Sequence, residues 1–193
     1  IQGVAHAHPK QPNVVVKTAT LSDPEHDPYV QFINLAMEHQ NNPFFPRIFS
    51  AKIVKAPKDT FYLDGGFGRR KDWEQGDPEE GQGYQLIVTM EKLVEFKDSK
   101  VTDAATDLLI QLGVPSDVAK GTKATGELFT YLNNSFTRKE LADSTQNEQF
   151  AEALRLLKPF IEYWGQDMHA GNWMVRLTGH GPQLVIIDPL QPE

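Results

Sequence analysis

The segment EYWGQDMHAGNWMVR, residues 162 to 176, gathers residue types that can do chemistry between an apolar helical run and an apolar strand-like run. Asp167 is followed five positions later by Asn172, and sixteen positions further on Asp188 ends the apolar stretch VIID. Two carboxylates and an amide supply the hard oxygen ligands that Mg²⁺ prefers, and one carboxylate could act as a base. Read alone, the segment fits a catalytic loop, a metal site or an ordinary turn.

Phosphoryl transfer is a reaction that would use this set of side chains. One or two protein oxygens and the substrate phosphates then hold Mg²⁺, while a separate carboxylate accepts the proton of the attacking hydroxyl group. Lys17, at the end of the β-branched run VVVK, would neutralise the phosphates of a nucleotide from another part of the fold.

The first half of the chain is predicted to be mostly strands with one helix. Two strands are expected within residues 3–19, a third at 47–54 and a fourth at 84–93, from their β-branched and aromatic content. Between the second and third, Asp27 can cap a helix whose first position suits Pro28. The stretch rich in Gly, Pro and charge before the fourth strand is expected to be a hairpin insertion.

The second half is predicted to be mostly helical and to end in a hairpin. Helices are expected at 102–113, 126–136 and 147–164, where apolar residues recur at helical spacing. The runs NWMVRL and QLVIID read as two strands joined through TGHGP, and they frame the opening segment.

Composition narrows the classes of function. A formal charge of −7 over 193 residues argues against a protein that binds nucleic acid by neutralising many phosphates. The absence of cysteine excludes disulfides, thiolate zinc sites and a cysteine nucleophile. Apolar runs are far shorter than the roughly 20 residues of a membrane span, so we expect no membrane segment and a cytoplasmic location.

The chain is thus predicted to be an α+β protein with an amino-terminal lobe at 1–90, a hinge at 91–96 and a carboxy-terminal lobe at 97–193. The cleft between such lobes is the expected ligand site. The order of motifs resembles that of the protein-kinase fold. VVVK stands where kinases carry V-A-I-K, LIVTMEKL resembles their fifth strand and hinge, DMHAGN matches D-x-x-x-x-N, and IIDP falls where D-F-G would be.

The motif D-x-H-x-G-N resembles that of the aminoglycoside and choline kinase branch more closely than that of typical protein kinases. In their order, VVVK, FFPRIF, LIVTMEKL, DMHAGNWMV and VIIDPL resemble the early host-shutoff serine/threonine protein kinases of teseptimavirus-type bacteriophages. That resemblance implies a minimal two-lobed protein-kinase-like fold. It also implies ATP-dependent phosphorylation of host proteins on Ser or Thr, including the transcription and RNA-processing machinery.

The resemblance further implies roles for individual residues. Asp167 would be the catalytic base, and His169 would contact the transferred phosphate. Lys17 would bind the phosphates of ATP, while Asn172 and Asp188 would bind Mg²⁺.

The same resemblance implies that the hinge would bind the adenine base of the nucleotide. Met90 would be the gatekeeper, and the backbone of Glu91 and Leu93 would face the base. ATP and Mg²⁺ are therefore the implied cofactors.

Departures from the kinase pattern keep two alternatives open. No glycine-rich turn precedes residue 3 in the given sequence, so either it lies upstream of Ile1 or ATP is not clamped in the usual way. The acidic partner of Lys17 is undecided among Glu25, Asp27 and Glu38. A small-molecule phosphotransferase of the aminoglycoside type is the first alternative. The second alternative is a pseudokinase that binds and inhibits a partner protein.

Overall fold

The computed structural model describes residues 4–21, 23–55, 61–63, 66–68, 83–95, 101–121, 131, 134–168 and 170–190. In these residues the protein is a mixed α+β structure with antiparallel sheets and five α-helices, which confirms the predicted α+β class. None of the described helices is long and apolar enough to cross a membrane. His169, most of the predicted helix at 126–136 and most of the predicted insertion lie outside the described residues.

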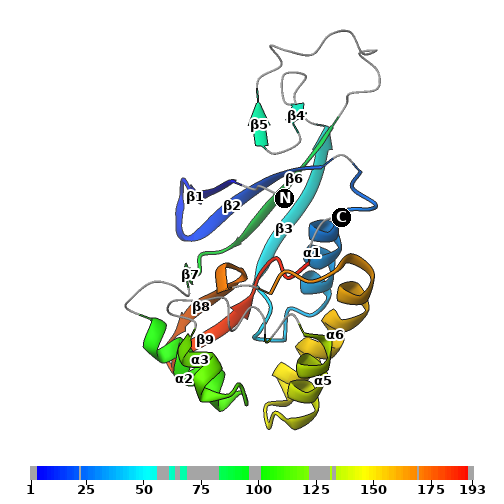
Figure 1. Cartoon of the computed structure of the whole chain (residues 1–193). Coiled ribbons are helices and arrows are strands. Elements are labelled where there is room, and N and C mark those ends of the chain that lie inside the picture. The colour runs from blue at the N-terminus through cyan, green and yellow to red at the C-terminus, as the bar shows by residue number, and fades with distance from the viewer. Residues whose placement is uncertain are drawn as a thin grey trace.

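The first sheet has four antiparallel strands in the order β1-β2-β6-β3 (Figure 1). Its strands are β1 (Val4–His8), β2 (Gln11–Leu21), β3 (Ile48–Lys55) and β6 (Tyr84–Glu91). All four predicted strands are confirmed, and a short turn at Pro9 and Lys10 joins the first two. Along β6, Leu86, Val88 and Met90 alternate as buried residues, so one face of the sheet builds the core.

Helix α1 (Pro28–Glu38) packs beside β3, and the Asp27 cap predicted from the sequence is confirmed. The Asp27 carboxylate accepts hydrogen bonds from the backbone N–H of Tyr29 at 2.9 Å and of Val30 at 3.1 Å. Pro28 occupies the first helical turn, where its missing N–H costs nothing. The cap fixes the start of the helix and therefore the position of Tyr29, whose side chain is buried.

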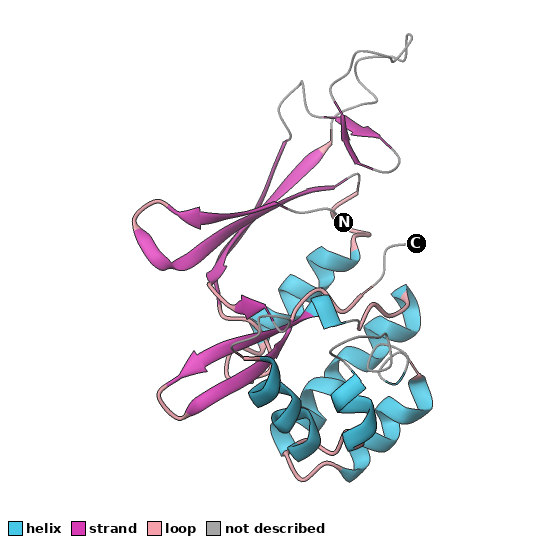
Figure 2. Ribbon diagram, turned by 60° about the vertical axis from the view of Figure 1, so that its left-hand side comes forward, coloured by secondary structure: helices cyan, strands magenta, loops and turns pink. Residues whose placement is uncertain are grey.

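The second sheet is small, antiparallel and ordered β7-β8-β9, with most of the helices near it (Figures 1 and 2). The remaining described elements are β7 (Val94–Glu95), β8 (Trp173–Thr178), β9 (Gly181–Ile186), α2 (Thr102–Gln111), α3 (Ser116–Gly121), α5 (Ser135–Ser144), α6 (Glu148–Trp164) and a separate pair, β4 (Phe61–Leu63) with β5 (Gly66–Gly68). The predicted helices at 102–113 and 147–164 and the closing hairpin are confirmed.

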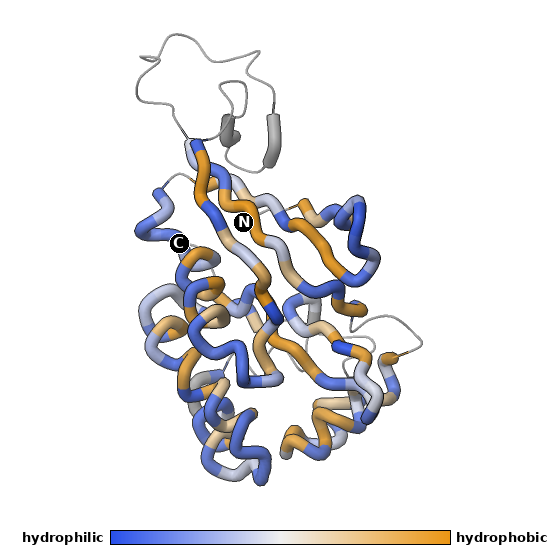
Figure 3. Tube along the Cα trace, turned by 180° about the vertical axis from the view of Figure 1, so that it is seen from behind, coloured by the Kyte–Doolittle hydropathy of each residue, from blue (hydrophilic) through white to orange (hydrophobic). Residues whose placement is uncertain are grey.

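One hydrophobic core runs from the first sheet through to the helices, and hydrophobic residues recur along the elements that surround it (Figure 3). The loop after α1 carries Phe44 and Phe45 into this core, where both are almost fully buried. Phe44 lies 4.9 Å from the ring of Phe150 in α6, and Phe150 lies 6.3 Å from Trp173 in β8. The aromatic contacts join parts of the chain that the sequence places far apart.

Candidate functional site

The structure brings Lys17 and Asp188 together across 171 residues of sequence. Lys17 lies in β2, opposite Val88 of β6, and its Nζ is 3.3 Å from Oδ2 of Asp188. Both side chains are about one-fifth exposed, at 18% and 21%, so water screens the pair only in part. The predicted phosphate ligand and one predicted metal ligand therefore meet in one place.

Besides Asp188, the Lys17 ammonium contacts the ring of Tyr29 in α1. The Lys17 ammonium lies 3.9 Å from the centre of the Tyr29 ring, within cation–π range. Burial raises the pKa of the Tyr29 hydroxyl well above 10.0, and the charges of Asp188 and Asp27 raise it further. Tyr29 is thus a neutral contact of Lys17 at physiological pH.

The acidic partner of Lys17 in the structure is Asp188. In the part of the chain that is described, the lysine pairs with Asp188 and with none of the three acids considered from the sequence. Glu25 and Glu38 are exposed, and the Asp27 carboxylate is bound to the backbone at the start of α1.

Asp188 holds an uncommon backbone conformation. Its φ is 47°, and it is the one non-glycine residue with a positive φ among the described residues. Asp tolerates this region better than most residues, but it precedes Pro189, and residues before proline favour extended conformations. Strain of this kind costs about 1–3 kcal/mol and gathers at functional sites.

The predicted catalytic loop is fastened to the chain around Asp188. Helix α6 ends at Trp164, and Gly165 after it has a φ of 82°, which glycine adopts without strain. Beyond it, the N–H of Asp167 donates to the carbonyl of Pro189 at 2.8 Å, and the N–H of Ile187 donates to the carbonyl of Asn172 at 2.8 Å. These two hydrogen bonds hold the backbone around Asp167 and Asn172 beside that around Asp188, so that the three residues form one cluster.

Asn172 is oriented by a hydrogen bond within this loop. Its side-chain nitrogen donates to the backbone carbonyl of Asp167 at 2.7 Å. Since the amide nitrogen is committed in this way, the Oδ1 oxygen is the atom left to act as a ligand. His169 lies outside the described residues.

A cavity of about 490 Å³ lies beside this cluster, between the two sheets. Four of its lining residues are those predicted to bind the nucleotide, namely Lys17, Met90, Glu91 and Leu93. Its other lining residues are largely apolar and include Tyr29, Val15, Trp173 and Ile187. Asp167, Asn172 and Asp188 are not among the lining residues, and of the described residues of the predicted catalytic loop Gly171 alone lines the cavity.

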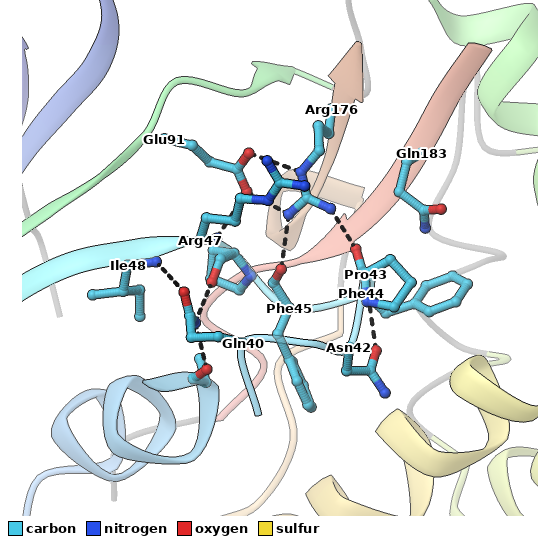
Figure 4. Close-up of polar contacts among 12 residues, drawn as sticks. Gln40, Asn42, Pro43, Phe44, Phe45, Arg47, Ile48, Glu91, Arg176 and Gln183 are labelled. Carbon is cyan, nitrogen blue, oxygen red and sulfur yellow. Dashed lines mark hydrogen bonds and ion pairs between the residues drawn. The ribbon is translucent and has the colours of Figure 1, made fainter. Parts of the chain in front are cut away.

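The Glu91 side chain is committed to a buried ion pair that the sequence did not predict (Figure 4). Arg176 of β8 donates from Nε to Glu91 Oε2 at 2.8 Å, and both residues are at least nine-tenths buried. Arg176 also donates to the carbonyls of Pro43 and Phe45 at 2.8 and 2.9 Å, and the N–H of Arg47 donates to Glu91 Oε1 at 2.8 Å. The network joins β6, β8 and the loop after α1.

Backbone bonds at the hinge limit what Glu91 can offer a ligand. Its N–H donates to the carbonyl of Arg47 at 3.0 Å, and the N–H of Lys92 donates to the carbonyl of Asn13 at 2.8 Å. Neither N–H group is therefore available to a base in the cavity.

Sequence reasoning missed Tyr29 and Arg176 as site residues. Arg176 carried a signal, because a charge within the apolar strand WMVRL must find a partner if the strand is buried. Tyr29 carried none beyond its place on the apolar face of a helix. Comparison with family models, with curated proteins and with solved structures gives no match to this chain.

Proposed function

We propose that the chain is a minimal two-lobed, protein-kinase-like phosphotransferase with lobes 1–90 and 97–193 and a hinge at 91–96. In this proposal it transfers the γ-phosphoryl group of ATP to Ser or Thr of host proteins, as in phage host takeover. The observation that carries the proposal is the contact between Lys17 and Asp188, together with the hydrogen bonds that tie the Asp167 loop beside Asp188. Kinases need a lysine, a metal-binding Asp, an Asn and a base in one such site.

The donor set fits Mg²⁺ that arrives with a nucleotide. Within the described residues no group of three or more His, Cys, Asp or Glu side chains could hold a metal alone. Mg²⁺ normally takes only one or two protein oxygens and completes its shell with phosphates and water. Asp188 and the Oδ1 oxygen of Asn172 would hold the ion, which when bound neutralises charge on the phosphates.

The remaining steps fall to protein groups. Lys17 would donate to phosphate oxygens, and Asp167 would accept the proton of the attacking hydroxyl group. The apolar walls at Val15, Met90 and Trp173 would take the flat base. Because the Glu91 N–H is already bound, polar recognition of adenine would use the Glu91 carbonyl and the Leu93 backbone.

A second candidate is a nucleotide-binding module with little or no catalysis. It is favoured by Tyr29, which stands against Lys17 where active kinases place a glutamate from the helix. A small-molecule phosphotransferase is the third candidate, because the motif D-x-H-x-G-N resembles that of the aminoglycoside and choline kinase branch.

Transfer from γ-labelled ATP distinguishes these functions. The wild type would be incubated with Mg²⁺, bacterial lysate proteins and small alcohols of the aminoglycoside and choline type. We expect label on protein, and about 10²–10⁴-fold less of it with Asp167→Asn, because this substitution removes the base but keeps its shape. Asp107→Ala, at an exposed position in α2, is the matched control.

The other outcomes are equally informative. Label on the small alcohols alone identifies a small-molecule enzyme, and nucleotide binding without any transfer identifies a binding module. Equal labelling by wild type and Asp167→Asn would remove Asp167 from the mechanism.

A further inference from the structure

We propose that Tyr29 is the positioning residue for Lys17. Its ring holds the lysine ammonium at the phosphate site, in the role that a helix glutamate has in protein kinases, without adding a negative charge. The consequences for phosphate binding rest on the proposed function, whereas the contact itself does not.

The ring is held firmly where it meets the lysine. Tyr29 is 3% exposed, and its backbone N–H is fixed by the Asp27 cap at 2.9 Å. The Lys17 ammonium lies 3.9 Å from the ring centre, well inside the roughly 6 Å range of cation–π attraction. The Lys17 side chain is only 18% exposed, and partial desolvation strengthens such attraction.

The other carboxylates near Lys17 are bound to other groups, so Tyr29 is the residue of α1 that can hold the lysine ammonium in place. Asp27 is bound to the backbone of α1, and Glu91 is paired with Arg176. Asp188 is therefore the one carboxylate that pairs with Lys17 in the described part of the chain.

The arrangement matters once Asp188 is used for Mg²⁺. Lys17 would then lose its carboxylate partner but keep the ring of Tyr29 on one side. An ammonium has three N–H donors, so phosphate oxygens can bind it while the ring stays in contact. A glutamate in place of Tyr29 would repel those phosphates, whereas the ring orients the lysine and leaves its charge for the ligand.

Two substitutions separate the ring from the hydroxyl. Tyr29→Phe keeps the aromatic face, and Tyr29→Leu removes it while still filling the site. We expect Tyr29→Phe to leave the KM for ATP unchanged, and Tyr29→Leu to raise it about 2- to 30-fold with a smaller effect on kcat. Phe45→Leu, a buried aromatic outside the cavity lining, controls for lost packing and should lower Tm without raising KM.

A second measurement needs no nucleotide. Protons on the Lys17 carbon next to Nζ should be shifted upfield in NMR by the ring current of Tyr29. We expect that shift in the wild type and in Tyr29→Phe and its loss in Tyr29→Leu.

The outcomes separate this inference from the proposed function. An unshifted Lys17 signal in the wild type, an unchanged KM in Tyr29→Leu, or equal effects of both substitutions would overturn the role of the ring. A wild type that shows the shift but binds no ATP would overturn the proposed function and leave the contact established.

Discussion

At the scale of single residues, buried charges are placed where each has a partner. Arg176 satisfies Glu91 and two backbone carbonyls in the junction between the sheets. Such a pair contributes little net stability against an apolar replacement, but removing one partner leaves the other charge buried alone. The pair therefore fixes how β6 and β8 meet.

Replacing Arg176 by Met should destabilise the protein by about 3–5 kcal/mol, because Glu91 would be left buried and unpaired. Urea denaturation monitored by circular dichroism measures the change in the free energy of unfolding. Adding Glu91→Leu to Arg176→Met should recover much of the loss.

The matched control is Arg155→Met, since Arg155 in α6 makes one hydrogen bond to a carbonyl and is exposed. Its expected cost is about 0.5–1.5 kcal/mol. If Arg176→Met cost no more than this control, Glu91 and Arg176 would not form a buried pair in solution.

The sequence points to some residues of the candidate site and not to others, for a physical reason. Lys17 and Asp188 could be singled out because each charge directly follows a run of apolar residues, VVV and VII, in the sequence. Tyr29 and Arg176 act through partners that are distant in sequence, Lys17 and Glu91, and a single sequence carries no record of such pairings. Tyr29 looks like any aromatic residue on the buried face of a helix.

At the scale of elements, the start of α1 links helix stability to the site, because the cap that begins the helix also places Tyr29. Asp27 is partly buried, and burial raises the pKa of its carboxyl group despite the two backbone hydrogen bonds it accepts. Between the unfolded and the folded pKa, the folded state therefore holds more protons than the unfolded state. The contribution of Asp27 to stability accordingly falls as the pH rises through that range.

We expect Asp27→Asn to keep the cap, because Asn also accepts hydrogen bonds from N–H groups at this position. It should also remove the cost of burying a charge. The variant should thus be more stable than the wild type at neutral pH, and this difference should shrink as the pH falls through the range of the Asp27 carboxyl. Urea denaturation at a series of pH values measures it.

Asp27→Ala is the comparison variant, because it removes the charge and the cap together and should lose about 0.5–2 kcal/mol relative to Asp27→Asn. A difference between wild type and Asp27→Asn that does not change with pH would show that the Asp27 charge carries no burial cost.

Most elements followed from local patterns. Apolar periodicity predicted α1, α2 and α6, with the Asp27 cap at the start of α1, and β-branched and other apolar runs predicted the strands of the first sheet and the closing hairpin. The order of that sheet did not follow, since β6 pairs with both β2 and β3 across long separations. Such pairing depends on contacts that no local window contains.

At the scale of the whole molecule, the cavity between the sheets is lined by the four residues predicted to bind the nucleotide, Lys17, Met90, Glu91 and Leu93. Residues from β2, α1, β6 and the segment after α6 surround it, and the Lys17–Asp188 pair lies at its side. We propose that this cavity binds Mg²⁺ together with a nucleotide.

Calorimetric titration of the protein with ATP, in the presence and absence of Mg²⁺, tests that claim most directly. We expect one ATP per chain in a Mg²⁺-dependent manner, and binding at least about tenfold weaker in Lys17→Met and in Asp188→Asn. Lys52→Met, an exposed lysine of β3 in the same sheet, should bind as the wild type does. Absence of ATP binding with Mg²⁺, or binding that neither site substitution weakens, would contradict the account.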